Sequence, residues 1–197
     1  GAASRICYNG AMTEAEKKRL PTKLLWVDLE MTGLRPEADV ILEVAVIVTD
    51  FALNETARYE SGVRCERELL EHLMDENPWY NEFPENKAHF LSLAGQGKDL
   101  EVVEEELIAF VREHFGDEPA VLAGNSIHND RNFIKHWWPA FDATLHYRML
   151  DVSAWKVWMQ GAYGVEFEKT DTHRALGDIR ESIAELQYYL DWLQQRS

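Results

Sequence analysis

Short apolar runs and turn residues dominate the first part of the chain after residue 23. The runs Leu24 to Val27 and Val40 to Thr49 have the length and β-branched content of buried strands. Asp50 and Asn54 flank a turn, so Thr56 to Cys65 is predicted to run back as a third strand. The pattern therefore predicts an antiparallel start to the sheet.

The pattern changes after this opening. Residues Glu66 to Gly97 carry Asn-Pro and Phe-Pro pairs, which predict short helices and loops. The later elements predicted are a helix at Leu100–Phe115, a strand at Ala120–Ala123, a helix at Asn129–Trp137, a strand at His146–Val152, a helix through Met159 and a last helix from about Thr172 to Leu193. Strands interleaved with helices after an antiparallel start predict one α/β domain with a mixed sheet over residues 24–197, preceded by an extension at 1–23.

Composition narrows the class of protein. The chain has 197 residues, of which 46% are hydrophobic, as expected for one globular domain. Its longest apolar runs, such as that around Val44 to Val48, are too short to cross a bilayer. Cys7 and Cys65 are interpreted as free thiols in a reducing compartment. We expect no membrane association and a cytoplasmic location, or the mitochondrial matrix.

The formal net charge of −15 limits the nucleic acids that such a chain can hold. Proteins that bind long nucleic acids neutralise phosphates with clustered Lys and Arg, and no basic run longer than Lys17-Lys18-Arg19 is present. A carboxylate-lined metal site that takes a ligand with few phosphates remains compatible with this charge, because bound cations supply the positive potential.

The first predicted strand continues into two acids, Asp28 and Glu30. Side chains two residues apart on a strand point to the same face, so these carboxylates lie side by side. They repel each other unless a cation lies between them. The alternative interpretation is a strand end that emerges into water with both acids solvated.

Two further acids and one histidine are candidates for the same site. Asp130 follows a buried strand at the entry to a helix, where a dipole-stabilised surface acid is the alternative. Asp178 lies beside the apolar stripe of the last helix, where an unpaired carboxylate is costly. His173 would lie at the frayed start of that helix, and a surface histidine is its alternative.

Together these residues favour a site for hard divalent cations. Mg²⁺ and Mn²⁺ prefer oxygen ligands, and two such ions can activate water against a phosphodiester. A histidine with a pKa near neutrality suits the role of general base. The sequence contains no Cys/His cluster for zinc, no glycine-rich phosphate loop and no nucleophile-elbow serine.

Four strings carry a family resemblance over about Leu24 to Tyr189. They are Asp28-Leu29-Glu30-Met31-Thr32-Gly33-Leu34, Gly124-Asn125-Ser126-Ile127 with Asp130, His146-Tyr147-Arg148 with Asp151-Val152-Ser153, and His173-Arg174-Ala175-Leu176 with Asp178. The chain thereby resembles the oligoribonucleases, a family of Asp-Glu-Asp-Asp exonucleases with a histidine base. The resemblance implies a ribonuclease H-like mixed β-sheet flanked by α-helices, and a homodimer.

The resemblance also implies roles for single residues. Asp28, Glu30, Asp130 and Asp178 would bind two divalent ions, Mg²⁺ or Mn²⁺, and His173 would act as general base. Leu34 would wedge against the bases, Tyr147 would reach the partner subunit's site, and the 5′ phosphate would be gathered by Ser126, Arg148 and Ser153. Without the resemblance, Tyr147 and Arg148 are surface residues of a strand and Leu34 is an apolar loop residue.

Three positions depart from the family pattern. Trp79 and His89 would contact base and sugar, but each stands in a string that predicts a local insertion, Met74 to Trp79 and His89 to Leu93. Gly177 stands where relatives usually carry an acid next to Asp178, and glycine lowers helix propensity by roughly 1 kcal/mol.

The resulting prediction is a 3′→5′ exoribonuclease that degrades short single-stranded RNA, dinucleotides above all, to 5′-mononucleotides. The alternatives are a related exonuclease acting on DNA or structured RNA ends, and a catalytically silent binding module on the same fold.

Overall fold

The sheet is the centre of the fold. A computed structural model describes residues 21–168 and 174–196, and its sheet has the strand order β3-β2-β1-β4-β5. The strands are β1 (Lys23–Met31), β2 (Ile41–Asp50), β3 (Glu55–Gly62), β4 (Ala120–Gly124) and β5 (Leu145–Asp151). The first three strands are antiparallel to one another, whereas β4 runs parallel to β1 and β5 parallel to β4. The predicted mixed sheet with an antiparallel start is confirmed.

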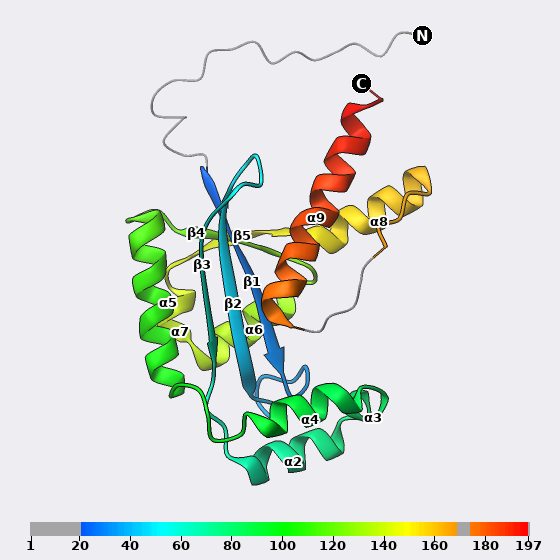
Figure 1. The fold of residues 1–197 in the computed structure, drawn as a ribbon. Coiled ribbons are helices and arrows are strands. Elements are labelled where there is room, and N and C mark those ends of the chain that lie inside the picture. Colours follow the sequence, from blue (N-terminus) through cyan, green and yellow to red (C-terminus); the bar gives the residue numbers. More distant parts are fainter. Residues whose placement is uncertain (1–20, 169–173, 197) are drawn as a thin grey trace.

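Helices cover both faces and one end of this sheet (Figure 1). They are α2 (Arg67–Glu76), α3 (Trp79–Glu82), α4 (Pro84–Ser92), α5 (Leu100–Phe115), α6 (His128–Trp137), α7 (Pro139–Asp142), α8 (Val152–Tyr163) and α9 (Ala175–Gln194). Figure 1 shows α5 and α7 on one side of the sheet, α8 and α9 on the other, and α2 to α4 beyond the end of β1. Within the described residues, no helix combines the length and hydrophobicity that a membrane crossing requires.

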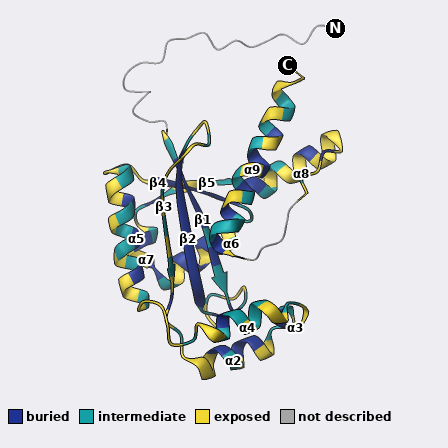
Figure 2. Cartoon of the chain, viewed as in Figure 1, coloured by how far each residue is buried: buried dark blue, intermediate teal, exposed yellow. Residues whose placement is uncertain are grey.

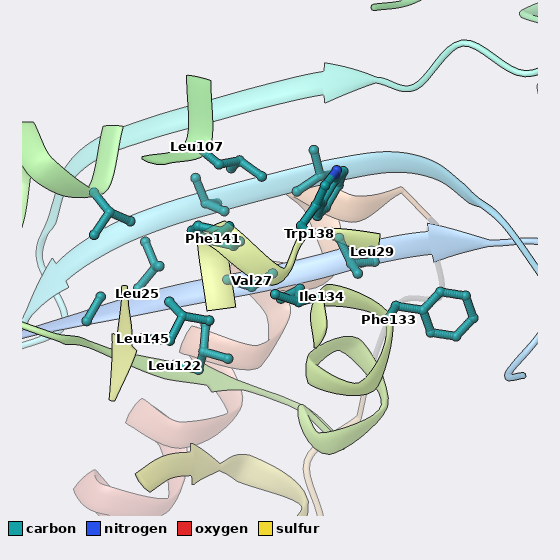
Figure 3. Packing of buried hydrophobic residues seen from close by; sticks show 14 of the residues in the cluster. Leu25, Val27, Leu29, Leu107, Leu122, Phe133, Ile134, Trp138, Phe141 and Leu145 are labelled. Atoms are coloured by element: carbon teal, nitrogen blue, oxygen red, sulfur yellow. The ribbon is translucent and has the colours of Figure 1, made fainter. Parts of the chain in front are cut away.

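The two faces of β1 belong to different hydrophobic clusters. Leu25, Val27 and Leu29 point to one side and pack with residues such as Leu107 and Trp138 (Figure 3). This cluster contains buried residues from α5, α6 and α7. Nearly all of β2, all of β4 and the middle of β1 are buried (Figure 2). Burying a large aliphatic or aromatic side chain contributes about 1.5–3 kcal/mol, so this cluster supplies much of the stability of the sheet.

The opposite face of β1 carries the candidate site residues. Leu24 and Trp26 pack there against Ile179 and Leu186 of α9. Because side chains alternate along a strand, the next residues on this face are Asp28 and Glu30. The apolar half of β1 therefore fixes α9 against the sheet, and the polar half lies beside the beginning of the same helix.

Some element boundaries differ from the predicted ones. The strand predicted to continue from Leu24 to Val27 into Asp28 and Glu30 is present, and β1 extends to Met31, where it still pairs with Ile41 of β2. Lys23, assigned to the extension, begins β1, and β3 ends at Gly62 rather than Cys65. The last helix begins at Ala175, and the predicted start at Thr172 lies outside the described residues.

Candidate active site

Asp28 and Glu30 lie where β1 loses one of its two neighbours. β4 pairs with β1 only through Trp26↔Ala123, so the second half of β1 has β2 alone as a hydrogen-bonded strand. Asp130, in the first turn of α6, continues the contact where β4 stops, because its Oδ1 accepts a hydrogen bond of 3.0 Å from the Leu29 amide. The second half of β1 is thereby fixed by a hydrogen bond to a buried carboxylate instead of by a second strand.

Three carboxylates converge on this face. Asp28, Glu30 and Asp178 each offer an oxygen, and these oxygens all lie within 4.8 Å of one another. All three side chains are partly buried, which rules out two fully solvated acids at a strand end. Asp178 reaches the pair from the first turn of α9. The predicted convergence of these three acids is what the structure shows, and the arrangement suits a divalent cation with oxygen ligands.

Asp130 lies next to this group but outside the set of three. It is buried, with 6% of its surface exposed, and burial raises the pKa of its carboxyl to about 7 against the opposing effect of the Leu29 N–H. Asp130 also raises the pKa of Glu30, so the two acids sense each other's charge. Asp130, the fourth predicted acid, is therefore a neighbour of the cluster. Its carboxylate already accepts a hydrogen bond from the β1 backbone.

The cluster is electrostatically unfavourable by itself. Burial raises the pKa of Glu30 to about 8, and Asp178 and Glu43 raise it further, while Arg174 opposes them. Carboxylates crowded in this way favour either a proton or a cation between them. The site therefore has the chemistry of a cation site.

Glu43 and Arg174 were not among the predicted site residues. Glu43 stands opposite Glu30 in the β1–β2 register and is buried, and Arg174 Nη2 lies 3.3 Å from its Oε2. The detectable signal was an acid inside the otherwise apolar stretch Ile41 to Val48. Arg174 directly precedes α9, so the ion pair fixes the start of that helix to β2. His173, the predicted base, lies outside the described residues.

A cavity of about 830 Å³ adjoins Glu30. Leu34 and Trp79 both line it, from the loop after β1 and from α3. Leu34 is 69% exposed, as expected of a side chain available to a ligand. The predicted pairing of Leu34 with Trp79 at one site is thus geometrically possible, whereas His89 is not among the residues lining this cavity.

His89 lies elsewhere on α4 but within the electrostatic reach of the site. Burial lowers the pKa of His89, and the positive charge of Arg174 lowers it further. Its Nε2 is buried without a hydrogen-bond partner among the described residues. The structure places His89 near the Arg174–Glu43 pair.

The loop that carries Leu34 is closed by Asp39. The Arg35 amide donates to Asp39 Oδ2 over 2.9 Å, and Thr32 Oγ1 donates to Asp39 Oδ1 over 3.3 Å. A Cβ on Gly33 would lie 2.6 Å from Asp39 Oδ2, so only glycine fits there without displacing the carboxylate. The loop also receives support from Tyr80, whose hydroxyl donates to the Met31 carbonyl over 2.9 Å.

Gly33→Ala is therefore expected to destabilise the fold by about 1–3 kcal/mol, because the methyl group collides with the buried Asp39 carboxylate. Thermal unfolding measures the loss. Gly161→Ala is the matched control, since a Cβ there meets nothing within 4 Å. Equal melting temperatures for the two variants would contradict the packing that we describe.

Ser126 and Ser153 form a second polar group, at the start of α6 and α8. Their hydroxyl oxygens lie 3.1 Å apart, and the Ser126 amide donates both to Ser153 Oγ (2.9 Å) and to Asp151 Oδ1 (3.0 Å). Ser126 has a φ of 50°, a left-handed conformation that these bonds hold in place. The predicted grouping of the two serines is present, and Asp151 is its organising acid.

Tyr147 and Arg148 occupy the exposed part of β5. Tyr147 is 72% exposed, and the Arg148 guanidinium lies 5.1 Å from the centre of its ring. In the part of the chain that the structure describes, no hydrogen bond joins either side chain to the serine pair. Both are available to a ligand or a second subunit.

The strand order and the carboxylate cluster at the end of β1 fit a nuclease of the ribonuclease H-like fold. The RNase_T exonuclease family matches residues 25–186. Solved structures agree on the fold: exonuclease I from Methylocaldum szegediense aligns with a TM-score of 0.55 at 19% identity, over 83% of this chain and 39% of that one. E. coli exonuclease I in complex with a dT13 oligonucleotide gives 0.56 at 15%, over 88% and 43%. The chain thus spans about two fifths of the length of these exonucleases.

Curated relatives identify the family more narrowly. The oligoribonuclease of Ectopseudomonas mendocina is 40% identical over 86% of this chain and 94% of its own length. The human mitochondrial oligoribonuclease is 37% identical over 94% of this chain and 79% of its own. The chain belongs to the oligoribonuclease family.

Proposed function

We propose that the protein is a 3′→5′ exoribonuclease that hydrolyses short single-stranded RNA, especially dinucleotides, to 5′-mononucleotides. The carboxylate cluster of Asp28, Glu30 and Asp178, beside a cavity lined by Leu34 and Trp79, is the observation that carries this proposal. Relatives named as oligoribonucleases support the choice of substrate. We also propose the cytoplasm or the mitochondrial matrix as its compartment, the latter because the human relative is named mitochondrial.

Two divalent ions, Mg²⁺ or Mn²⁺, complete the proposed site. Asp28, Glu30 and Asp178 would hold them together with Asp130, and the donor set fits because every ligand is a carboxylate oxygen. Bound ions of this kind lower the pKa of water and stabilise the leaving oxygen of a phosphodiester.

The remaining residues of the site position the substrate and move protons. We assign His173 as the general base that takes the proton of the attacking water. The Leu29 N–H holds Asp130, and Arg174 with Glu43 holds the start of α9, so that the acids keep their places when substrate enters. Leu34 and Trp79 would enclose bases in the cavity. His89 would contact the sugar from α4, outside the lining of that cavity.

The length limit would come from the 5′ end. We propose that Ser126, Ser153 and Arg148 receive the 5′ phosphate, since hydroxyl and guanidinium donors match its oxygens. A substrate that fits between this 5′-phosphate contact and the metal site is short and carries one or two phosphates. This explains how a chain with a net charge of −15 can bind RNA.

A homodimer is part of the proposal. Tyr147 of β5 and Val157 of α8 are each 72% exposed, and Trp158 of α8 is 64% exposed. Exposed large apolar side chains are typical of protein interfaces. In such a dimer Tyr147 would reach the partner subunit's site.

Arg148→Ala is expected to raise KM about tenfold for dinucleotides with a 5′ phosphate, because a charge-assisted hydrogen bond is lost. Dinucleotides with a 5′ hydroxyl should change little. Steady-state kinetics on the two substrates measure the difference. Arg58→Ala on β3 is the control, since this arginine lies on the opposite edge strand of the sheet. Equal losses on both substrates would refute the phosphate contact.

A product time-course tests the proposed function. RNAs of two to about ten nucleotides, labelled at the 5′ end, and DNA strands of the same lengths are incubated with Mg²⁺ or Mn²⁺. We expect stepwise loss of 3′ nucleotides and the highest kcat/KM for dinucleotide RNA. Preference for a long strand or for DNA would indicate a related exonuclease instead, and absence of hydrolysis with either ion would indicate a binding module.

A further inference from the structure

Glu43 lies where a further negative charge is costly. It stands directly opposite Glu30 in the β1–β2 register, and like charges at such positions share one face of the sheet and repel each other. The Glu43 side chain is only 12% exposed, so water screens little of this repulsion. The rest of the stretch Ile41 to Val48 is apolar, so strand pairing does not require an acid at this position. A buried acid beside a cluster of acids therefore calls for a role of its own.

Arg174 supplies a positive charge that both of these acids sense. Its Nη2 lies 3.3 Å from Glu43 Oε2, and its charge lowers the pKa of Glu30. The Asp178 amide donates to the Arg174 carbonyl over 2.9 Å, so these two residues lie one helical turn apart at the start of α9. The Arg174 side chain is 49% exposed and has room to change its partner. Among the described residues, its ion pair is with Glu43.

An arginine in this position competes with a metal ion. A guanidinium binds carboxylates through charge-assisted hydrogen bonds, and Glu30 and Asp178 are carboxylates that the proposed cations also need. Opposite residues on antiparallel strands have Cβ atoms roughly 5 Å apart, so the guanidinium can pass from Glu43 to Glu30 by rotation of its side chain alone. Such a contact would occupy a metal ligand.

We propose that Glu43 is a positioning residue that holds Arg174 away from the carboxylates of the metal site. The pair of Glu43 and Arg174 is neutral as a unit, so the cluster of Asp28, Glu30 and Asp178 keeps its attraction for a cation. Without Glu43, the guanidinium turns to the cluster and occupies its oxygens. The inference rests on the metal site of the proposed function, and it explains a buried acid that is not among the three converging carboxylates.

Calorimetric titration of Mn²⁺ into four proteins tests this role. Glu43→Gln should weaken Mn²⁺ binding roughly twentyfold, because Arg174 then pairs with the metal-site acids. Arg174→Gln should bind Mn²⁺ about threefold more tightly than the wild type, because a nearby positive charge is removed. In the double variant, Glu43→Gln should cost less than about fourfold relative to Arg174→Gln alone. Losses of equal size in both backgrounds would show that Glu43 acts on the cation directly and would overturn the proposal.

A role of the ion pair in anchoring α9 alone gives a different result. It predicts that Glu43→Gln and Arg174→Gln weaken Mn²⁺ binding to the same extent, since either change breaks the pair. Ala175 and Ile179 are buried against the sheet, so we expect α9 to keep its position and both variants to keep their helix content by circular dichroism. Opposite effects of the two substitutions on Mn²⁺ affinity support the proposal, and equal weakening contradicts it.

Glu55→Gln is the matched control. Arg180 of the same helix has its Nη2 3.8 Å from Glu55 Oε2, and its side chain is also 49% exposed. This substitution breaks an ion pair between α9 and the sheet that does not involve the acid opposite Glu30. It should leave Mn²⁺ affinity within about twofold of the wild type, and a loss as large as that of Glu43→Gln would contradict a specific role for Glu43.

The wild-type isotherm separates the two levels. A wild-type protein without saturable Mn²⁺ binding would refute the metal site on which the proposed function rests. Saturable wild-type binding that Glu43→Gln leaves unchanged would refute only the role of Glu43.

Discussion

Glu30→Gln is expected to lower turnover of dinucleotide RNA by at least about 10³-fold, with the fold intact. The substitution removes a charged ligand oxygen from the cluster with Asp28 and Asp178. A loss of that size corresponds to roughly 4 kcal/mol of transition-state stabilisation, which is within the range that metal ions contribute. Initial rates with saturating Mg²⁺ or Mn²⁺ measure it.

The same variant should be more stable than the parent protein when no metal is bound. Burial and the neighbouring Asp178 raise the pKa of Glu30 to about 8, so its ionised form is costly at neutral pH. Glutamine keeps the shape without the charge. The expected gain is on the order of 2–4 kcal/mol in the free energy of unfolding at pH 8.

Glu105→Gln is the matched control for both effects, because Glu105 is an exposed residue of α5. It should leave turnover and the melting temperature unchanged. A Glu30→Gln variant that retains activity, or one that unfolds more easily than the parent protein in chelator, would contradict this account of the cluster.

The second large effect is a pH dependence of stability that metal removes. In the metal-free protein the pKa of Glu30 is about 8 when folded and 4.5 when unfolded. Between these values the folded state binds more protons than the unfolded state, so stability falls as pH rises from about 4.5 to about 8 and is constant above. Asp130, with a pKa raised to about 7, acts in the same direction.

Melting temperatures at pH 5.5 and 8.5, with chelator or with Mg²⁺, measure this dependence. With chelator we expect a decrease of roughly 5–10 °C between the two pH values, given about 2–4 °C for each kcal/mol in a protein of this size. Mg²⁺ should largely abolish the decrease, because the cation keeps the acids ionised at low cost. Glu30→Gln should weaken the decrease in chelator. Identical curves with and without Mg²⁺ would contradict the cation site.

The sequence predicted the sheet and the main acids because both follow from local rules. Alternation along β1 placed Asp28 and Glu30 on one face, and the apolar stripe of α9 placed Asp178 beside the core. The sequence placed Asp130 at the entry to a helix, with a surface acid as the alternative, and the family resemblance implied its metal role; its position beside β1 depends on a hydrogen bond to Leu29 across 101 residues. That bond has no local signature in the sequence.

Long-range polar contacts were the part that the sequence did not reveal. Arg174 pairs with Glu43 across 131 residues, and Asn125 meets Glu185 across 60. Each of these side chains is an ordinary polar residue in its own segment, and only the packing of α9 on the sheet brings the partners together. The end of the third strand was misplaced, since β3 ends at Gly62 and the prediction carried it to Cys65.

The most direct test of the central claim is a calorimetric titration of Mn²⁺ into the wild-type protein and into the Asp28→Asn and Asp178→Asn variants. The account predicts saturable binding to the wild type, and binding at least about tenfold weaker to both variants at unchanged helix content. Isotherms that coincide for all three proteins would show that these carboxylates do not form the metal site.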